Sequence, residues 1–312
     1  MSVKNLATGI KANIEKVIYG KGDKIDLILC ALFSGGHVLL DDIPGTGKTS
    51  LARALARSIS SDVKRIQFTP DLLPSDITGI NYYDRKTSDF VFREGPVFTN
   101  ILIADEINRT TPRTQSALLE CMGEGQTTVD GVTYKMKDLF FVIATQNPIE
   151  SQGTFPLPEE QTDRFLMKLS MGYPEKDAEL TMLDEHRVVS PLDTLESVCT
   201  TEDVVACYNE VREVNVSDKI KEYIIAIINE TRTSSRIRLG ASPRGTLALM
   251  RASQAYAAMD GRDYVIPDDV KAVAPSVLAH RIITRTNTTQ SLAQNNETVI
   301  DFILDTVKAP IE

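Results

Sequence analysis

One stretch near the N-terminus, VLLDDIPGTGKTS at residues 38–50, constrains the fold of this chain more than any other. It opens with an apolar run that is typical of a buried strand and continues through a turn rich in glycine and proline. Leu51, Leu55 and Ile59 then recur every four positions, which predicts the apolar face of a helix. A strand, a glycine-rich turn that ends in Lys-Thr, and a helix are the parts of a phosphate-binding loop.

Each residue type in this loop has a physical reason to be there. Gly45 and Gly47 let backbone N–H groups turn toward an anion, and the helix N-terminus adds a partial positive charge. Lys48 is expected to reach the β- and γ-phosphates, and Thr49 is expected to place its hydroxyl on Mg²⁺. Asp42 stands where the motif usually has its first glycine, but the half that closes around the phosphates is intact. The predicted binding residues are Pro44, Gly45, Thr46, Gly47, Lys48, Thr49 and Ser50. A plain flexible turn is the alternative, and the lysine and threonine disfavour it.

Composition narrows the class of protein. With 312 residues, 42% of them hydrophobic, the chain can form two domains with ordinary cores. The sequence has no apolar run long enough to span a membrane and no apolar signal-peptide segment at its start. Its four cysteines form no CxxC pair, which favours buried thiols in a reducing cytoplasm. The net charge of −9 argues against a broad nucleic-acid surface. We therefore expect a cytoplasmic protein without membrane insertion.

Two carboxylates follow a second apolar strand, Ile101 to Ala104. Ligands bind at the carboxyl ends of strands in open α/β sheets, which is where Asp105 and Glu106 stand. Asp105 is expected to hold Mg²⁺, usually through water, while Glu106 polarises the attacking water. These carboxylates could instead cap the following helix. Their position downstream of Lys48 and Thr49 favours the catalytic interpretation.

Two further polar residues follow strands. Asn147 comes after the apolar run at 139–144 and could bond both the γ-phosphate and the lytic water, although Asn-Pro is also typical of a turn. Arg164 precedes a strand at 165–169. It is either a salt-bridge partner of Asp163 or an arginine finger that stabilises phosphoryl transfer, and the residues themselves favour neither.

From Tyr173-Pro174 onward the strands cease, which indicates a domain boundary between 1–174 and 175–312. Ser242 suits an N-cap and Pro243 a first helical position, so Arg244 projects from a helix start. The helix dipole disfavours an arginine there, and a nearby phosphate would offset this. The predicted helical segments are 175–189, 201–213, 217–231, 242–259, 267–285 and 297–307.

The first part of the chain holds other predicted elements. Residues 4–34 read as two helices around a break at 19–22, and the turn at 17–20 could either contact an adenine ring or simply join the helices. Residues 82–92 predict a hairpin inside a long insertion. Residues 108–122 read as a helix. Asp130-Gly131 between β-branched residues predicts another hairpin at 126–136.

Together these motifs resemble an AAA+ ATPase, with Walker A at 42–49, Walker B at 101–106, a first sensor at Asn147 and a second sensor at Arg244. More specific strings resemble the MoxR family. They are GHVLL at 36–40, QFTPDLLPSD at 67–76, ADEINR at 104–109, ATQNP at 144–148, DRF at 163–165 and GASPR at 240–244. One departure is Gly123-Glu124-Gly125, where the family more often has Glu and Arg.

The resemblance implies an α/β fold with a five-stranded parallel sheet, followed by a small all-α lid. It also implies a hairpin inserted in helix 2 at about 79–95 and a pore-lining hairpin at 126–136. The family forms rings, usually hexameric, in which Arg164 acts on a neighbour's ATP and Arg244 acts from the lid of its own subunit. Its members are chaperone-like and work with partners that carry von Willebrand factor A domains.

The expected function is Mg-dependent ATP hydrolysis that remodels or matures a protein partner, for example by complex assembly or metal insertion. The predicted catalytic residues are Glu106, Asn147, Arg164 and Arg244, and Thr49 and Asp105 are the predicted Mg²⁺ ligands. A nucleic-acid-directed AAA+ motor or loader is the main alternative. A nucleotide-gated scaffold that does not hydrolyse ATP is another.

Overall fold

A five-stranded sheet organises the molecule in the computed structural model, which describes residues 2–41, 45–147, 154–185, 191–285 and 292–310. All neighbouring strands in this sheet are parallel, and the spatial order is β2-β5-β8-β1-β9. The carboxyl ends of the strands therefore meet at one edge of the sheet. The strands are β1 (Val38–Asp41), β2 (Val63–Gln67), β5 (Ile101–Asp105), β8 (Phe141–Gln146) and β9 (Met167–Leu169).

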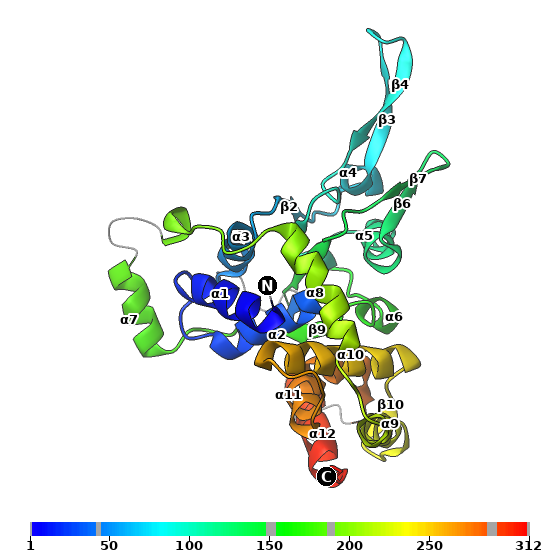
Figure 1. Ribbon diagram of the computed structural model, residues 1–312. Coiled ribbons are helices and arrows are strands. Elements are labelled where there is room, and N and C mark those ends of the chain that lie inside the picture. The colour runs from blue at the N-terminus through cyan, green and yellow to red at the C-terminus, as the bar shows by residue number, and fades with distance from the viewer. Residues whose placement is uncertain (1, 42–44, 148–153, 186–190, 286–291, 311–312) are drawn as a thin grey trace.

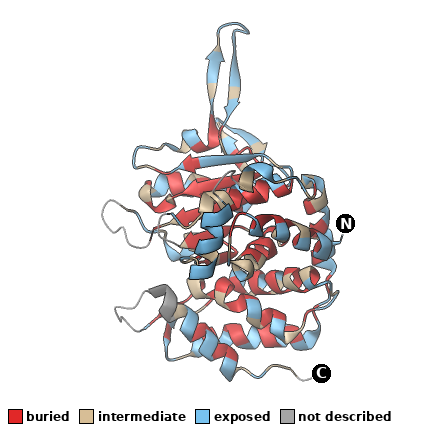
Figure 2. Ribbon diagram, turned by 90° about the vertical axis from the view of Figure 1, so that its left-hand side faces the viewer, coloured by how far each residue is buried: buried red, intermediate tan, exposed pale blue. Residues whose placement is uncertain are grey.

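Alternating side chains of these strands build a separate core on each face of the sheet, because successive residues of a strand point to opposite faces. Val38 and Leu40 pack with α1 (Val3–Glu15), α2 (Gly22–Phe33) and α3 (Lys48–Ser58). Leu39 lies in the other core with residues of α5 (Pro112–Glu124). The apolar strands are therefore covered on both faces, as Figure 2 shows by its band of buried residues.

Two hairpins project from the sheet-bearing part (Figure 1). They are β3 (Gly79–Asp84) with β4 (Asp89–Glu94), which follow the short α4 (Pro74–Thr78), and β6 (Gln126–Val129) with β7 (Val132–Lys135). Asp130 and Gly131 both have positive φ, as a type I′ turn requires. Phe92 stacks on Tyr134 at 4.0 Å between ring centroids, and Asn81 Nδ2 donates to Asp130 Oδ2 at 2.8 Å. The two hairpins therefore contact each other, and the turn of the second hairpin lies against β3 of the first.

The C-terminal part is mainly helical and packs against the N-terminal helices. Helices α8 and α10 contact both α1 and α2, and one hydrophobic core runs from the sheet into this region. The predicted fold class, a five-stranded parallel sheet followed by a helical part, is confirmed. The helices here are α7 (Lys176–Glu185), α8 (Thr201–Glu213), α9 (Asp218–Thr233), α10 (Pro243–Asp260), α11 (Pro267–Leu278) and α12 (Leu292–Thr306). Within the described residues, no helix is both long and apolar enough to cross a membrane.

Two local predictions differ from the structure. The helix predicted over 267–285 ends at Leu278, and the chain continues through η3 (Ala279–Arg281) into β11 (Ile283–Thr284). This strand pairs with β10 (Ile237–Leu239), because β-branched residues suit a strand better than a helix end. The helical part therefore contains a small antiparallel ribbon. The helix predicted from Asn108 begins only at Pro112, after the turn η1 (Ile107–Arg109).

Candidate active site

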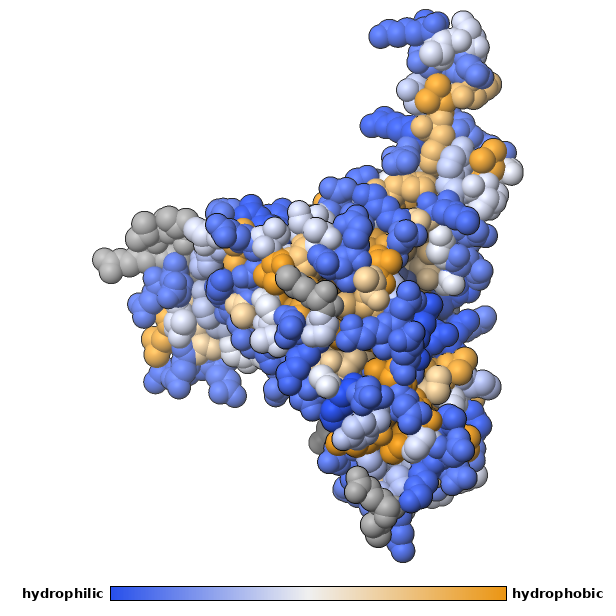
Figure 3. Space-filling model, in the orientation of Figure 1, coloured by the Kyte–Doolittle hydropathy of each residue, from blue (hydrophilic) through white to orange (hydrophobic). Residues whose placement is uncertain are grey.

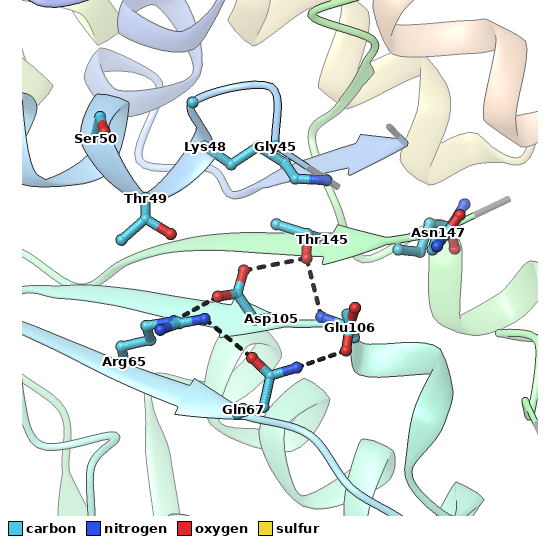
Figure 4. Close-up of a pocket in the computed structure, with 12 residues that line it drawn as sticks. Gly45, Lys48, Thr49, Ser50, Arg65, Gln67, Asp105, Glu106, Thr145 and Asn147 are labelled. Atoms are coloured by element: carbon cyan, nitrogen blue, oxygen red, sulfur yellow. Dashed lines mark hydrogen bonds and ion pairs between the residues drawn. The ribbon is translucent and has the colours of Figure 1, made fainter. Parts of the chain in front are cut away.

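A cleft of about 350 Å³ opens at the carboxyl ends of the central strands, beside the start of α3 (Figure 4). Residues of the phosphate-binding loop form one wall, and residues of β2, β5 and β8 form the other. The cleft therefore lies where a parallel sheet is expected to bind a ligand. Its lining residues are Gly45, Gly47, Lys48, Thr49, Ser50, Arg65, Gln67, Asp105, Glu106, Thr145, Gln146 and Asn147.

The loop has the backbone that an anion cradle needs. Gly45 and Gly47 have φ of +88° and +82°, a left-handed conformation that side chains with a Cβ disfavour. Gly47 is the N-cap of α3, so the helix begins at Lys48 with its free N–H groups at the cleft. The predicted residue Pro44 and the unusual Asp42 lie outside the described residues. Thr46 belongs to the same loop but is not among the residues that line the cleft.

Thr49 and Asp105 face each other across the cleft (Figure 4). A hydroxyl and a carboxylate are oxygen ligands of the kind that Mg²⁺ prefers, so this pair fits the predicted metal. Among the described residues, no group of three or more His, Cys, Asp or Glu side chains could hold a metal by itself. A magnesium ion here would therefore need phosphate and water oxygens to complete its shell.

Both carboxylate oxygens of Asp105 have partners. Arg65 Nε lies 2.5 Å from Oδ2, and the Thr145 hydroxyl donates to Oδ1 at 3.2 Å. The same hydroxyl accepts a bond from the backbone N–H of Glu106 at 2.9 Å. Thr145 is buried, so it fixes the end of β5 against β8.

Glu106 has an unusual backbone for a residue other than glycine, with φ +57° and ψ +48°. Such a conformation is strained and is found disproportionately at functional sites. It ends β5 and turns the carboxylate into the cleft, where Gln67 Nε2 lies 2.5 Å from Oε2. Arg109 Nε lies 3.3 Å from the same oxygen. Arg65 Nη2 donates to Gln67 Oε1 at 3.0 Å, so one chain of contacts joins Asp105 to Glu106 (Figure 4).

Asn147 lines the cleft directly after β8, next to the two carboxylates. Its side chain is buried, and its backbone carbonyl accepts a bond from Asn108 Nδ2 at 3.4 Å. The turn after Glu106 is therefore tied to the segment that carries Asn147. The structure thus brings together four of the residues that the sequence singled out, namely Lys48, Asp105, Glu106 and Asn147.

Arg164 and Arg244 do not line this cleft. Arg164 Nη1 donates to the carbonyl of Leu119 on α5 at 2.9 Å and lies against Gly123. A Cβ at Gly123 would require this guanidinium to shift. Gly125 ends α5 in a left-handed conformation. The unusual Gly123-Glu124-Gly125 string therefore makes room for an arginine and ends a helix.

Asp163 pairs with arginines of the helical part, and no ion pair with Arg164 is found among the described side chains. Arg281 Nε lies 2.6 Å from Asp163 Oδ1, and the Ser242 hydroxyl donates to Oδ2 at 3.0 Å. Arg244 Nη1 lies 3.9 Å from Oδ2, with its side chain 55% exposed. Arg281 also donates to backbone carbonyls at and after Asp163. We call this group, Asp163, Ser242, Arg244 and Arg281, the lid joint.

Sequence reasoning missed Arg65, Gln67, Thr145 and Arg281. Arg65 and Gln67 are two positions apart on β2, so they share one face of that strand. This spacing would have indicated a functional role only if it were already known that β2 lies next to β5 in the sheet. Arg281 lay inside a predicted helix and carried no local signal.

Comparison with known proteins supports one family. The model of the ATPase family associated with various cellular activities (AAA) matches residues 37–167, and the AAA lid domain model matches residues 229–301. The Bacillus subtilis protein YeaC is 52% identical over 96% of this chain and 93% of its own length. Chaperone MoxR1 of Mycobacterium tuberculosis is 38% identical over 95% of this chain and 80% of its own length.

A solved structure agrees with these matches. The crystal structure of a candidate ATPase from Cytophaga hutchinsonii superposes with a TM-score of 0.89 and 37% identity, over 99% of this chain and 96% of that one. The similarity therefore extends over the sheet, the cleft and the helical part alike. The chain is a member of the MoxR family of AAA+ ATPases.

Proposed function

We propose that this chain hydrolyses ATP to ADP and phosphate with Mg²⁺, within a ring of like chains, and uses the cycle to remodel a protein partner. The observation that carries the proposal is the meeting of Lys48, Asp105, Glu106 and Asn147 in one cleft. A cation, a metal ligand, a general base and a polar positioning group are the parts that phosphoryl transfer to water requires.

Each residue has a distinct task in this proposal. Lys48 and the backbone N–H groups at the start of α3 bind the phosphates. Thr49 and Asp105 hold Mg²⁺, which when bound neutralises charge on the phosphate oxygens. Glu106 accepts a proton from the attacking water, and Asn147 orients that water. Gln67 donates to one of the two carboxylate oxygens of Glu106, and the carboxylate has further acceptor positions for the attacking water.

We further propose that Arg164 and Arg244 both act on the nucleotide of a neighbouring chain. Neither residue lines the cleft of its own chain. Arg244 lies beside Asp163, and Arg164 contacts α5. In Figure 1 the helix α6 (Glu159–Thr162), just before Arg164, lies on the opposite side of the molecule from α3. This proposal departs from the expectation that Arg244 serves its own subunit, because its contact with Asp163 favours a shared role with Arg164.

The partner is proposed to be a protein, with a von Willebrand factor A domain as the expected module. One relative is named a chaperone, which supports a remodelling role. Figure 3 shows apolar side chains on the projecting hairpins, and Tyr83 and Phe90 of β3 and β4 are among the exposed hydrophobic residues. Metal insertion and complex assembly are the proposed outcomes. The proposed domain division at residue 174 separates the sheet-bearing part from the lid.

Mixing inactive variants tests the shared site. Lys48→Ala removes the phosphate-binding lysine, and Arg164→Ala removes the proposed arginine finger. Each variant alone should hydrolyse ATP at least about 10³-fold more slowly than the unaltered chain. In a mixture, an intact cleft of one chain can meet an intact Arg164 of the other, so phosphate release should partly return. No recovery would mean that Arg164 serves its own chain.

The same mixture made with Arg244→Ala tests the second arginine. Recovery with Lys48→Ala supports action on a neighbour, and its absence supports action within one chain. A mixture of Arg164→Ala with Arg244→Ala is the control. It should stay inactive, because both arginines come from the same side of one chain and no cleft then meets a complete pair.

A further inference from the structure

Among the described residues that line the cleft, Arg65 is the one strongly charged side chain to which the proposed hydrolysis gives no task. It lies on β2, the edge strand of the sheet, and reaches the carboxylate of Asp105 on the neighbouring β5. Its Nε is 2.5 Å from Asp105 Oδ2. The guanidinium reaches this carboxylate from the β2 side, while Thr49 lies on its other side (Figure 4).

Magnesium must contend with a partner that is already in place. Asp105 Oδ1 accepts the Thr145 hydroxyl, and Oδ2 accepts Arg65. A metal ion, or a water molecule bound to it, needs one of these oxygens. A carboxylate oxygen can accept more than one bond, but a second cation beside Oδ2 is repelled by Arg65, so binding of the metal favours the departure of a partner.

The two partners differ in how easily they can leave. Thr145 is 2% exposed and already accepts the N–H of Glu106, so its departure would leave a buried donor unsatisfied. The Arg65 side chain is 51% exposed and can swing into water with its charge intact. Arg65 is the partner that gives way.

We propose that Arg65 is a built-in competitor of Mg²⁺ for Asp105, so that the cleft binds the metal well only when nucleotide phosphates are present. The proposal rests on the proposed function and adds a regulatory residue to the same site. Because the guanidinium of Arg65 offsets the charge of the Asp105 carboxylate, a divalent ion alone is attracted only weakly. Phosphate oxygens add negative charge and metal ligands, which favour replacement of Arg65 by the metal.

The exchange also reaches Glu106. Arg65 Nη2 donates to Gln67 Oε1, and Gln67 Nε2 donates to Glu106 Oε2. When Arg65 leaves Asp105, Gln67 loses the group that orients its amide. Metal binding at Asp105 therefore weakens the bond from Gln67 to Glu106, while Arg109 still lies beside the same oxygen.

Metal-dependent nucleotide binding tests this proposal without any turnover. The probe is a fluorescent non-hydrolysable ATP analogue, and its Kd is measured in EDTA and in saturating Mg²⁺. The ratio of the two Kd values reports how strongly metal and nucleotide favour each other. Arg65→Gln should lower this ratio by about two- to five-fold, the range of a half-exposed ion pair, because the empty cleft then binds the metal better.

Two controls separate direct competition from general charge effects. Lys64→Gln removes the same charge from the next residue of β2, whose ammonium is bonded to the Phe98 carbonyl, and should leave the ratio unchanged. In an Asp105→Asn background, Arg65→Gln should have no further effect, because the contested oxygen has lost its charge.

The outcomes are distinguishable. A higher or unchanged ratio in Arg65→Gln, with normal thermal unfolding, would overturn the competitor role. An effect of equal size in the Asp105→Asn background would also overturn it, since Arg65 would then act on the phosphates directly. If the unaltered chain binds the analogue no better with Mg²⁺ than without, the proposed function itself fails.

Discussion

Two arginine–aspartate pairs in this molecule have similar geometry and different surroundings. In the cleft, Arg65 lies 2.5 Å from Asp105, and its side chain is 51% exposed. In the lid joint, Arg281 lies 2.6 Å from Asp163, and its side chain is 2% exposed. Arg281 also bonds the carbonyls of Phe165 and Leu166, so its donors are held by the backbone.

The difference teaches which contacts can change during a cycle. An exposed pair is worth little and can be replaced by water or a metal ion, whereas breaking a buried pair leaves an uncompensated charge. The cleft is therefore built for exchange, and the lid joint is built to hold Arg244 beside the segment that carries Arg164.

The largest expected effect is a loss of ATP hydrolysis caused by a change in the cleft. Glu106→Gln should lower kcat by about 10²- to 10⁴-fold, since the amide cannot accept a proton from water. The melting temperature should change little, because the contacts of Glu106 are half-exposed. Phosphate release and thermal unfolding check both parts. Glu120→Gln, an exposed change on α5, is the matched control and should alter neither.

The second largest expected effect is a loss of stability caused by a change in the lid joint. Arg281→Met should reduce the free energy of unfolding by about 3–5 kcal/mol, because it leaves the Asp163 carboxylate without its buried partner. Arg65→Met should change it by less than about 1 kcal/mol. Urea unfolding of both variants measures the contrast. Equal losses would show that the two pairs do not differ in the way proposed.

Low pH should reduce the stability of the sheet-bearing part, which contains the cleft. Burial lowers the pKa of His37 to about 4, and its ring accepts the N–H of Val142 and contacts the carbonyl of Met122. Below its ordinary pKa of about 6.5 the unfolded chain binds a proton that the folded chain does not, so stability falls as the pH falls.

Between pH 7 and pH 5 this residue should remove about 2 kcal/mol of stability. Burial and Arg281 also lower the pKa of His280, which adjoins the lid joint, so both regions lose stability in the same direction. Unfolding in urea at several pH values measures the slope. His37→Gln should flatten it, and a slope that is unchanged in that variant would contradict the assignment.

The smallest effect concerns the cap of α10. Ser242→Ala removes the cap bond to Gly245 and the bond to Asp163, and should reduce stability by about 1–2 kcal/mol. Ser217→Ala removes only a cap bond, at the start of α9. Thermal unfolding of the two variants isolates the Asp163 contact. If the losses are equal, Ser242 adds nothing to the lid joint beyond its cap.

Local patterns predicted much of the fold. Alternating and apolar runs gave the strands of the sheet, and Asp130-Gly131 gave the turn between β6 and β7. These predictions succeeded because backbone preference and burial act over short stretches of chain. Motif spacing in the same way brought Lys48, Asp105 and Asn147 to one cleft.

The missed residues depend on contacts between distant segments. Arg65 looks like an ordinary solvent-facing charge on an edge strand, and only its place beside β5 sets it against Asp105. Arg281 is 118 residues from Asp163 in the chain. No periodicity or spacing rule links such pairs, because the link exists only after the helical part has folded back onto β9.

The left-handed backbone at Glu106 has an evolutionary consequence. Glycine and asparagine adopt that conformation more readily than glutamate, so either would relieve backbone strain. Mutations selected only for a stable fold would therefore tend to replace the glutamate. Under the proposed function, a related chain that carries Gly or Asn at this position is expected to bind ATP without hydrolysing it.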